Sequence, residues 1–358
     1  MKALLLAGGL GTRLRPLTED LPKPMAPLGN RPWLEHLILH LKQEGIEQFV
    51  IAVKHYPEVI QRHFGDGSRL GVEIQYAVEK QLLGTAGAIK NAEPMLSDQF
   101  LVINADVVQM APLLPLLEFH RSHGGAVTIG LTRVEDPSAY GVVELTLDGK
   151  ITRFVEKPPR DQAPSNLINA GIYVMKKEVL EFIPANQEVS IERETFPLLI
   201  EQGAGVYGTV IEGYWMDMGT TERYRQAHWD ILDGKVPLQL PATRQKQGVY
   251  LGKNVQIGKG VILVPPVLIG DHVVLEDNST IGPYAVIGNH SRIGKGSSCS
   301  RSIIWESTSI ASGSYVVDCI LCDHLLTGAD QMMHGAVIKL KMDRRHLQKS
   351  GKMAVAKA

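Results

Sequence analysis

Cysteine is scarce in this chain, and neither sign of charge is in excess. The 358 residues include only three cysteines, all after residue 298, so the sequence predicts no disulfide framework. Lysine and arginine number 37 against 38 aspartates and glutamates. The formal net charge of −1 therefore gives no indication of a nucleic acid or an anionic membrane as a partner.

Long hydrophobic runs are lacking as well. No apolar run approaches the roughly 20 residues that a membrane-spanning helix needs. The run at residues 3–7 is too short for the core of a signal peptide and ends in two glycines. We therefore expect a cytoplasmic protein. Its composition, 44% apolar and 21% charged, is that of a globular chain, and its length suffices for two domains.

A glycine-rich turn follows the strand-like run at residues 3–7. The glycines of this turn are Gly8, Gly9 and Gly11. Because glycine has no Cβ, the backbone can turn tightly there and approach a ligand, and the freed amide groups point at anions. The basic side chains that come next are Arg13, Arg15 and Lys23. The combination predicts a site for a triphosphate or a pyrophosphate.

Two common glycine motifs do not describe this turn. A dinucleotide-binding fingerprint needs a third glycine at position 14, where this chain has Leu14. A P-loop needs G-x-x-x-x-G-K-[ST], and no stretch of the sequence has this pattern.

Strand-like and helix-like segments alternate over residues 1–235. This alternation predicts an α/β domain with a Rossmann-like, mostly parallel sheet covered by helices on both faces. Ligands of such sheets bind at the carboxyl ends of the strands. The expected strands are 3–7, 48–53, 73–78, 100–104, 126–131, 141–146, 151–156 and 168–174, and the expected helices include 33–44, 113–122 and 221–232.

A different pattern begins after an irregular linker at 236–248. From there to about residue 330 an aliphatic residue recurs every six positions, usually followed by glycine, which is typical of a parallel β-helix of hexapeptide repeats. The positions are Leu251, Ile257, Leu263, Ile269, Leu275, Ile281, Ile287 and Ile293, and after a slip by one at Cys299 they continue as Ile304, Ile310, Val316 and Cys322. The basic tail, 331–358, could form a short helix that caps the coils or could be disordered.

Carboxylates mark candidate metal ligands. Asp106 follows the apolar run FLVIN, where it could bind Mg²⁺ and nucleotide phosphates, although an Asp that only makes a turn is an alternative. Asp217 lies in the apolar, aromatic stretch GYWMDMG, where a buried carboxylate needs a metal or a basic partner. A structural ion pair explains Asp217 equally well.

Other polar and small residues allow both functional and structural readings. Lys157, in FVEKP, could hold a second phosphate or be an ordinary surface lysine. Groups suited to sugar hydroxyls are Glu156, Asn169 and Gly171. Gly84 and Gly87 stand at an expected helix start, where they could admit a planar base or only allow close helix packing. The spacing of Cys319, Cys322 and His324 is similar to part of a zinc site, but zinc normally needs four ligands, so we interpret these cysteines as packing residues.

Together these motifs resemble those of the sugar-1-phosphate nucleotidyltransferases. The chain has GGLGTRLRPLT, LPKPM, LGTAGAI, NADV, YGVVE, FVEKP, NAGIYV and WMDMG in the order found in that family. The likeness extends over residues 1–330 and is greatest to the mannose-1-phosphate guanylyltransferases. It implies a GT-A-like nucleotidyltransferase fold followed by a left-handed β-helix. It also implies conversion of GTP and mannose 1-phosphate to GDP-mannose and pyrophosphate.

The resemblance implies a role for each matching residue. The nucleoside triphosphate would be held by Leu6, Ala7, Gly8, Gly9, Gly11, Thr12 and Arg13, with Glu79, Gly84 and Thr85 around the base. Catalysis would depend on Arg13, Lys23, Asp106 and Asp217, and the two aspartates would bind Mg²⁺. The sugar phosphate would be held by Gly141, Glu156, Lys157, Asn169 and Gly171.

Base chemistry adds one argument for GTP. Guanine has two adjacent donors, N1–H and the 2-amino group, and a carboxylate such as that of Glu79 can accept from both. Thymine and uracil have one donor flanked by acceptors, so they suit an amide better. A thymidylyl- or uridylyltransferase acting on glucose 1-phosphate remains the alternative.

Three further alternatives have a different function. A glycosyltransferase of similar fold would lack GTRLRP followed by KPM, because it never holds pyrophosphate. A regulatory subunit that only binds nucleotide sugar would be expected to have lost Arg13, Lys23 or an aspartate. An acyltransferase activity in the β-helix would need a long catalytic loop that is not evident here. We expect the β-helix to serve assembly of a homodimer or larger homo-oligomer.

Overall fold

The computed structural model describes residues 1–245 and 248–340. The chain divides into two compact units. The first consists of Met1–Gly11, Asp20–Met25 and Leu37–Met218, and the second of Thr12–Glu19, Ala26–His36 and the chain from Gly219 onward. The domain boundaries expected from the sequence, 1–235 and 249–330, follow sequence pattern and stay a prediction.

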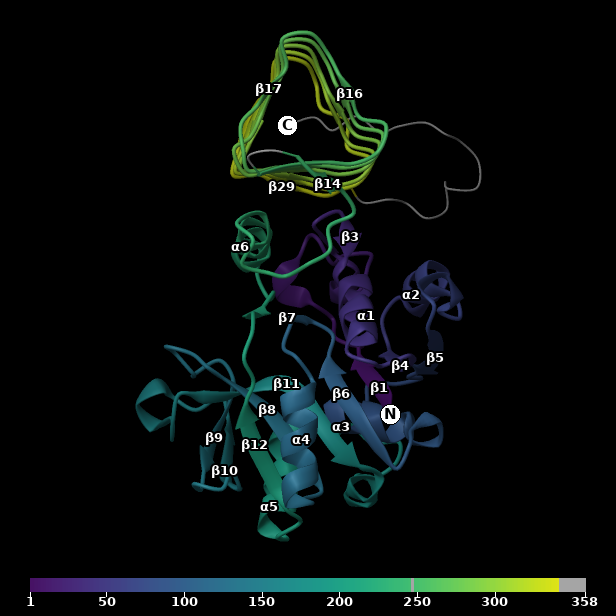
Figure 1. The fold of residues 1–358 in the computed structure, drawn as a ribbon, viewed down its shortest axis with the longest axis vertical. Helices are drawn as coiled ribbons and strands as arrows, with labels where there is room; N and C mark the ends of the chain where they lie inside the picture. The colour runs from purple at the N-terminus through teal and green to yellow at the C-terminus, as the bar shows by residue number, and fades with distance from the viewer. Residues whose placement is uncertain (246–247, 341–358) are drawn as a thin grey trace. The chain divides into compact units, whose positions relative to one another are not determined.

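A nine-stranded mixed sheet forms the first unit (Figure 1). Its strands are β1 (Lys2–Leu6), β4 (Gln48–Val53), β5 (Glu73–Val78), β6 (Gln99–Asn104), β8 (Val127–Arg133), β9 (Gly141–Leu145), β10 (Ile151–Glu156), β11 (Leu167–Lys176) and β12 (Val206–Val210). They run in the order β10-β9-β11-β6-β1-β4-β5, with β8 paired to β11 and β12 to β8. Strands β6, β1, β4 and β5 are parallel, and the antiparallel β11 joins them to β8 and β9. The predicted Rossmann-like fold is confirmed.

The strand sequences explain why this sheet lies inside the unit. The middle of β1 is buried without alternation, as expected for a strand with both faces covered. Ala3, Leu4 and Leu5 are fully buried there. Helices α2 (Pro57–Phe64), α3 (Gly84–Asn91), α4 (Leu114–His123) and α5 (Phe196–Glu201) and the short helical turns η2 (Lys23–Met25) and η7 (Ile191–Thr195) belong to the first unit. Helix α6 (Thr221–Leu232) and the turn η1 (Thr12–Leu14) belong to the second unit, and α1 (Trp33–Gln43) has residues in both. Of the two small ladders, β7 (Val107–Gln109) with β13 (Trp215–Asp217) belongs to the first unit, and β2 (Pro27–Leu28) with β3 (Arg31–Pro32) belongs to the second.

The second unit contains the predicted β-helix, whose short parallel strands form three sheets around a triangular section (Figure 1). The first sheet consists of β14 (Thr243–Arg244), β15 (Val249–Leu251), β18 (Val267–Ile269), β21 (Ala285–Ile287), β24 (Ile303–Ile304), β27 (Ile320–Leu321) and β29 (Val337–Ile338), of which only β14 is antiparallel to its neighbour. The second consists of β16 (Gln256–Ile257), β19 (Val274–Leu275), β22 (Arg292–Ile293) and β25 (Ser309–Ile310). The third consists of β17 (Ile262–Leu263), β20 (Thr280–Ile281), β23 (Ser298–Ser300), β26 (Tyr315–Val317) and β28 (Met332–His334).

Close stacking of the coils explains the glycine that follows most of the aliphatic repeat positions. A Cβ on Gly258 would lie 2.6 Å from Asp277 Oδ1, and one on Gly294 would lie 2.4 Å from the Ser312 nitrogen. These atoms belong to the next coil along the stack, so a larger residue would push two coils apart. The aliphatic residues themselves form the core, where Ile269, Ile281 and Ile287 are fully buried.

The predicted repeat register is wrong at one position. Ile304 pairs with Leu321, not with Cys322, so Leu321 is the core position of its coil. The reason is that coils stack: the step that shortens from six residues to five between Cys299 and Ile304 lies at the same corner of the next coil. The step from Val316 to Leu321 must therefore shorten as well. Cys319 also packs in this core.

The coil stack continues past residue 330. Strands β28 and β29 pair in parallel with β26 and β27, so residues 331–340 add to the β-helix. The remainder of the predicted basic tail, 341–358, lies outside the residues that the structure describes.

Candidate functional site

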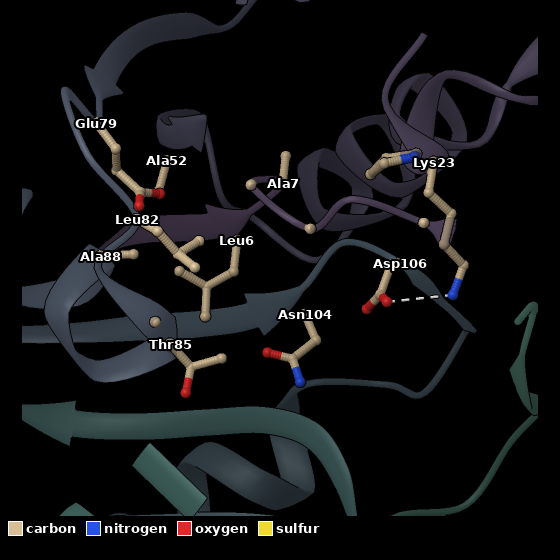
Figure 2. A pocket seen from close by; sticks show the side chains of 15 residues that line it. Leu6, Ala7, Lys23, Ala52, Glu79, Leu82, Thr85, Ala88, Asn104 and Asp106 are labelled. Carbon is tan, nitrogen blue, oxygen red and sulfur yellow. Dashed lines mark hydrogen bonds and ion pairs between the residues drawn. The ribbon is translucent and has the colours of Figure 1, made fainter. Parts of the chain in front are cut away.

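A cavity of about 270 Å³ opens beside the carboxyl ends of strands β1, β4 and β6 (Figure 2). It brings together most of the residues expected to hold a nucleotide. The lining residues are Leu6, Ala7, Gly8, Gly9, Gly11, Lys23, Pro24, Ala52, Glu79, Leu82, Gly84, Thr85, Ala88, Asn104 and Asp106. The glycine-rich turn, the start of α3 and the segment after β6 thus share one hollow of the first unit.

One end of the cavity holds a buried carboxylate (Figure 2). The side chain of Glu79 is 6% exposed, and its Oε2 accepts a hydrogen bond of 3.3 Å from the Leu83 amide. Burial raises the pKa of Glu79, while the Leu83 amide and the positive charge of Lys54 act in the opposite direction. A carboxylate with so little access to water gains from any ligand that offers hydrogen-bond donors.

The glycine that begins α3 is required by close packing. Gly84 has a φ of +66°, and a Cβ there would lie 2.5 Å from the carbonyl oxygen of Val189. The segment that contains Val189 runs alongside this turn, because Val189 donates to the Leu83 carbonyl and accepts from the Ala86 amide, both at 2.9 Å. The turn that brings Glu79 and Thr85 to the cavity is therefore braced by a segment distant in sequence.

At the other end of the cavity Lys23 pairs with Asp106 (Figure 2), and it also pairs with Asp217. Lys23 Nζ is 3.1 Å from Asp106 Oδ2 and 3.2 Å from Asp217 Oδ1. The Lys23 side chain is 4% exposed, that of Asp217 12% and that of Asp106 44%. Asp217 reaches this position because β13 pairs with β7 in a register that sets Asp217 opposite Val107, one residue after Asp106.

This end of the cavity fits a hard divalent cation. Asp106 and Asp217 both direct an oxygen toward the position of the Lys23 ammonium, so a cation is already stabilised there. Among residues 1–245 and 248–340 no group of three or more histidine, cysteine or acidic side chains could hold a metal. Two carboxylates suit Mg²⁺ nonetheless, because this ion usually keeps waters and takes its other ligands from substrate phosphates.

The residues expected to hold a sugar phosphate lie on the antiparallel part of the sheet. Gly141 is opposite Glu156 in the β9–β10 pair, and a Cβ on Gly141 would lie 2.5 Å from the Phe154 ring. The exposed ammonium of Lys157 is 3.4 Å from Glu156 Oε1. Burial and the nearby charge of Glu192 raise the pKa of Glu156, and Lys157 partly offsets this.

Asn169 and Gly171 form a small polar turn within β11. The Asn169 side chain accepts from the Gly171 amide at 2.9 Å and donates to the Tyr173 hydroxyl at 2.8 Å. Tyr173 is fully buried, and burial raises its pKa well above the usual range. It is therefore a neutral hydroxyl that fixes the orientation of Asn169.

Of the residues expected to hold the nucleotide, Thr12 and Arg13 do not line the cavity. Thr12 and Arg13 form η1 (Thr12–Leu14), which is part of the second unit, and both are exposed. They follow the cavity residue Gly11 directly in the chain.

Sequence reasoning missed Glu192. Its Oε2 accepts from the Thr85 hydroxyl at 2.8 Å and from the Ser190 hydroxyl at 2.9 Å. Thr85 Oγ1 in turn accepts from the Ile191 amide at 2.8 Å. Glu192 lies on the π-helical turn η7, a conformation often found at functional sites. The sequence around Glu192, SIERETFP at residues 190–197, has no local pattern that predicts this role. Asn104, which also lines the cavity, was missed too.

A cavity at the strand ends of an α/β sheet, lined by a glycine-rich turn and by charged side chains, is the usual place for a phosphorylated ligand in this class of fold. Comparison with known families agrees with this class: the family model described as Nucleotidyl transferase matches residues 2–234. The chain belongs to this family and is an enzyme of the transferase class. The model described as GMPPB C-terminal domain matches residues 263–339, within the second unit.

Curated relatives resemble the chain over most of its length. A mannose-1-phosphate guanylyltransferase of Mycobacterium tuberculosis is 43% identical, covering 70% of this chain and 69% of the relative. A mannose-1-phosphate guanyltransferase of Saccharomyces cerevisiae is 41% identical over 71% of this chain and 70% of the relative. A UTP–glucose-1-phosphate uridylyltransferase of Synechocystis is 37% identical over the same shares of the two chains.

Solved structures share the fold of about two thirds of the chain. A putative glucose-1-phosphate thymidylyltransferase of Bacillus anthracis has a TM-score of 0.58 at 26% identity, covering 64% of this chain and 94% of that one. HddC of Yersinia pseudotuberculosis, complexed with GMP-PN, has a TM-score of 0.56 at 27% identity, covering 64% and 99%. In the part of this chain that the structure describes, no helix has the length and apolar character to cross a membrane.

Proposed function

We propose that this enzyme converts GTP and mannose 1-phosphate to GDP-mannose and pyrophosphate. Relatives named for this reaction, 41% and 43% identical to the chain, support the choice of substrates. The structural observation that carries the proposal is the buried carboxylate of Glu79, which lies in the same cavity as Lys23 and Asp106. A base would occupy the Glu79 end and the reacting phosphates the Lys23 end.

Glu79 favours guanine over the other bases. Two carboxylate oxygens can accept from the adjacent N1–H and 2-amino groups of guanine at once. Adenine and cytosine place an acceptor beside their exocyclic amine, and uracil and thymine flank one N–H with two carbonyls. Any of these four bases would place an acceptor next to an oxygen of the buried Glu79 carboxylate. The resulting repulsion and loss of solvation cost more free energy than the one remaining hydrogen bond contributes.

The chemistry requires positioning and charge neutralisation rather than a general base. An oxygen of the sugar phosphate attacks the α-phosphorus of the triphosphate in line, the new P–O bond forms, and the bond to pyrophosphate breaks. The attacking phosphate has a second pKa of roughly 6, so it is mostly ionised at neutral pH. Two polyanions must nevertheless approach one another, and Lys23, Arg13 and Lys157 would lower that repulsion.

The metal cofactor is proposed on the same grounds. Asp106 and Asp217 would hold Mg²⁺, which when bound offsets the negative charge of the triphosphate. Lys23 offsets one of the two negative charges of these carboxylates and keeps their oxygens directed to one point. The glycine-rich turn would hold the phosphates through backbone amides, and Arg13 would follow it with full charge.

The sugar phosphate would bind on the antiparallel part of the sheet. Glu156 and Asn169 would accept and donate hydrogen bonds to sugar hydroxyls, and Lys157 would pair with the phosphate. Gly141 and Gly171 would leave room for the sugar. Support for this assignment comes from the fixed orientation of Asn169 and from the partly buried, negatively charged surroundings of Glu156.

An activity grid tests the proposal. The full chain is incubated with Mg²⁺, each of GTP, ATP, CTP, UTP and dTTP, and either mannose 1-phosphate or glucose 1-phosphate, and pyrophosphate release is measured. We expect GTP with mannose 1-phosphate to have the highest kcat/KM. A clear preference for UTP or dTTP would contradict the proposed reaction with GTP. UTP with glucose 1-phosphate is the second candidate, because the Synechocystis relative is 37% identical.

Self-association through the β-helix is a further part of the proposal. Apolar side chains are exposed in the outer coils, where Ile257 is 49%, Ile262 57% and Met332 85% exposed. Uncovered coil ends and strand edges favour pairing with a second copy. Light scattering at micromolar concentration checks this point, and a monomer would refute it.

A further inference from the structure

The loop at the centre of the proposed phosphate site packs with the β-helix unit. Residues Thr12–Glu19 belong to the compact second unit. In the chain they lie between Gly11 and Lys23, which both line the cavity of the first unit. The packing of this loop is therefore set within the second unit.

One side chain from the end of the β-helix bonds to this loop. Lys339 Nζ donates a hydrogen bond of 2.7 Å to the carbonyl oxygen of Leu17, a residue more than 300 positions away in sequence. Lys339 directly follows β29, the last strand of the first β-helix sheet. A charged donor makes this a strong hydrogen bond compared with a neutral pair.

The position of Lys339 is fixed from a second side. Its ammonium lies 5.4 Å from the centre of the Trp305 ring, within the range of a cation–π interaction. Trp305 is 2% exposed, and its Nε1 donates at 3.0 Å to the Tyr224 hydroxyl, which in turn donates to the Pro27 carbonyl. The Lys339 ammonium is therefore held between the buried Trp305–Tyr224 pair and the Leu17 carbonyl of the loop.

The loop itself has one buried and one exposed side. Leu14 and Leu17 are fully buried, whereas Arg13 and Arg15 are exposed. Hydrogen bonds from Leu17 N to Leu14 O and from Glu19 N to Pro16 O give it a compact shape. The hydrogen bond from Lys339 to the Leu17 carbonyl thus restrains the backbone of the loop, whose exposed side contains Arg13 and Arg15.

We propose that Lys339 is a positioning residue for nucleotide binding: it holds the Leu17 carbonyl and so orients the loop that carries Arg13. The inference rests on the proposed function, because it assumes that this loop binds the triphosphate. Preorganised charge is worth more than charge that must be ordered on binding. Loss of Lys339 should therefore weaken nucleotide binding without disturbing the sheet.

Three single variants of the full chain test this role. Lys339→Met removes the donor and keeps the length of the side chain, and Lys339→Arg keeps a charged donor that can also stack on Trp305. Lys259→Met, at an exposed lysine of the first coil, is the matched control. We expect Lys339→Met to raise the KM for GTP roughly tenfold, since a hydrogen bond to a charged group is lost. Lys339→Arg should recover most of that loss, and Lys259→Met should match the wild type.

Two further measurements separate positioning from stability. Hydrogen exchange of the amides in Thr12–Glu19 should become faster in Lys339→Met, while Tm stays close to that of the wild type. A chain that ends after Leu340 keeps Lys339 and should keep the wild-type KM, whereas one that ends after Ile338 should behave like Lys339→Met.

The outcomes are distinct. If the wild type turns over GTP and Lys339→Met has the same KM, the role of Lys339 is refuted and the proposed function stands. A fall in Tm with unchanged KM also refutes it, because the contact is then only structural. If the wild type neither turns over nor binds any nucleotide with Mg²⁺, both proposals fall.

Discussion

The ammonium of Lys23 lies between Asp106 and Asp217, and the carboxylate of Asp106 is the more exposed of the two. Its side chain is 44% exposed against 12% for Asp217. A single lysine, itself buried, balances one of the two negative charges. The remaining negative charge would bind a divalent cation, which in turn would bind the substrate phosphates. We therefore expect both aspartates to matter equally for turnover, but the buried Asp217 to matter more for stability.

Substitution of each aspartate by Asn separates its effect on turnover from its effect on stability. Asp106→Asn should lower kcat by about 10²–10³, by analogy with the loss of one preorganised electrostatic group, and leave Tm nearly unchanged because Asp106 is half exposed. Asp217→Asn should lower kcat as much and also lower Tm, since it leaves a buried lysine with one partner fewer. Steady-state kinetics with varied Mg²⁺ and thermal melts measure both quantities. Near-normal Mg²⁺-dependent turnover in Asp106→Asn would contradict the metal role.

Base selection should depend on the ionisation of Glu79. Glu79→Gln offers one acceptor and one donor, which matches the N3–H and O4 of uracil or thymine better than guanine. We expect the KM for GTP to rise roughly tenfold or more and the preference for GTP over UTP to shrink. In the wild type the KM for GTP should rise as pH falls through the raised pKa of Glu79, because the protonated group loses one acceptor.

Stability should change in the opposite direction at this residue. Burial raises the pKa of Glu79, so folding favours its protonated form, and the ionised carboxylate costs stability at neutral pH. That cost disappears as pH falls below the raised pKa. Glu79→Gln should thus have a Tm at pH 7 equal to or above that of the wild type. A clear fall in Tm would mean that Glu79 is a structural rather than a binding residue.

Gly9 offers a test of the phosphate loop that does not disturb the fold. A Cβ on Gly9 would meet no atom within 4 Å, whereas one on Gly84 would lie 2.5 Å from a backbone oxygen. Gly9→Ala should keep the wild-type Tm and lose affinity for GTP, because the methyl group would enter the cavity. Gly84→Ala should lower both. Calorimetric titration with GTP and Mg²⁺ is the measurement, and unchanged affinity in Gly9→Ala would exclude this turn from the phosphate site.

Local pattern was enough to predict where single residues lie on the fold. The apolar run before Asp106 fixed it at a strand end, and the glycine spacing predicted the turn after β1. The hexapeptide repeat predicted the β-helix and its core. In each case the signal lies within a few residues of the feature, because strand periodicity and turn chemistry are local properties.

Contacts between distant segments could not be predicted in this way. Asp217 meets Asp106 only because two three-residue strands, β7 and β13, pair in one register, and strands so short have no pattern of their own. The Thr85–Glu192 hydrogen bond depends on a π-helical turn, which has no sequence signature. The second register slip at Leu321 follows only once the coils are known to stack.

Buried histidines should make the fold sensitive to acid. Burial lowers the pKa of His36, His120 and His228 to about 4, from an ordinary value of 6.5. Their neutral forms are favoured in the folded chain, so the stability they contribute is complete above pH 6.5 and is lost as pH falls toward 4. Melts from pH 7.5 to 4.5 should show a falling Tm, less steep in His120→Asn and unchanged in slope in His290→Asn, an exposed histidine. A constant Tm over this range would refute the argument.

Position along the coil stack should decide what each repeat residue contributes to stability. Ile281 is fully buried, whereas Ile257, in the first coil, is 49% exposed although it occupies an equivalent repeat position. Ile281→Ala should cost about 2–5 kcal/mol, the usual range for such a core truncation, and Ile257→Ala less than about 1 kcal/mol. Chemical denaturation of both variants at low protein concentration measures the difference. If Ile257→Ala proves as costly as Ile281→Ala at high concentration but not on dilution, a second copy of the chain covers the first coil. Equal costs at all concentrations would contradict the expected dependence on position in the stack.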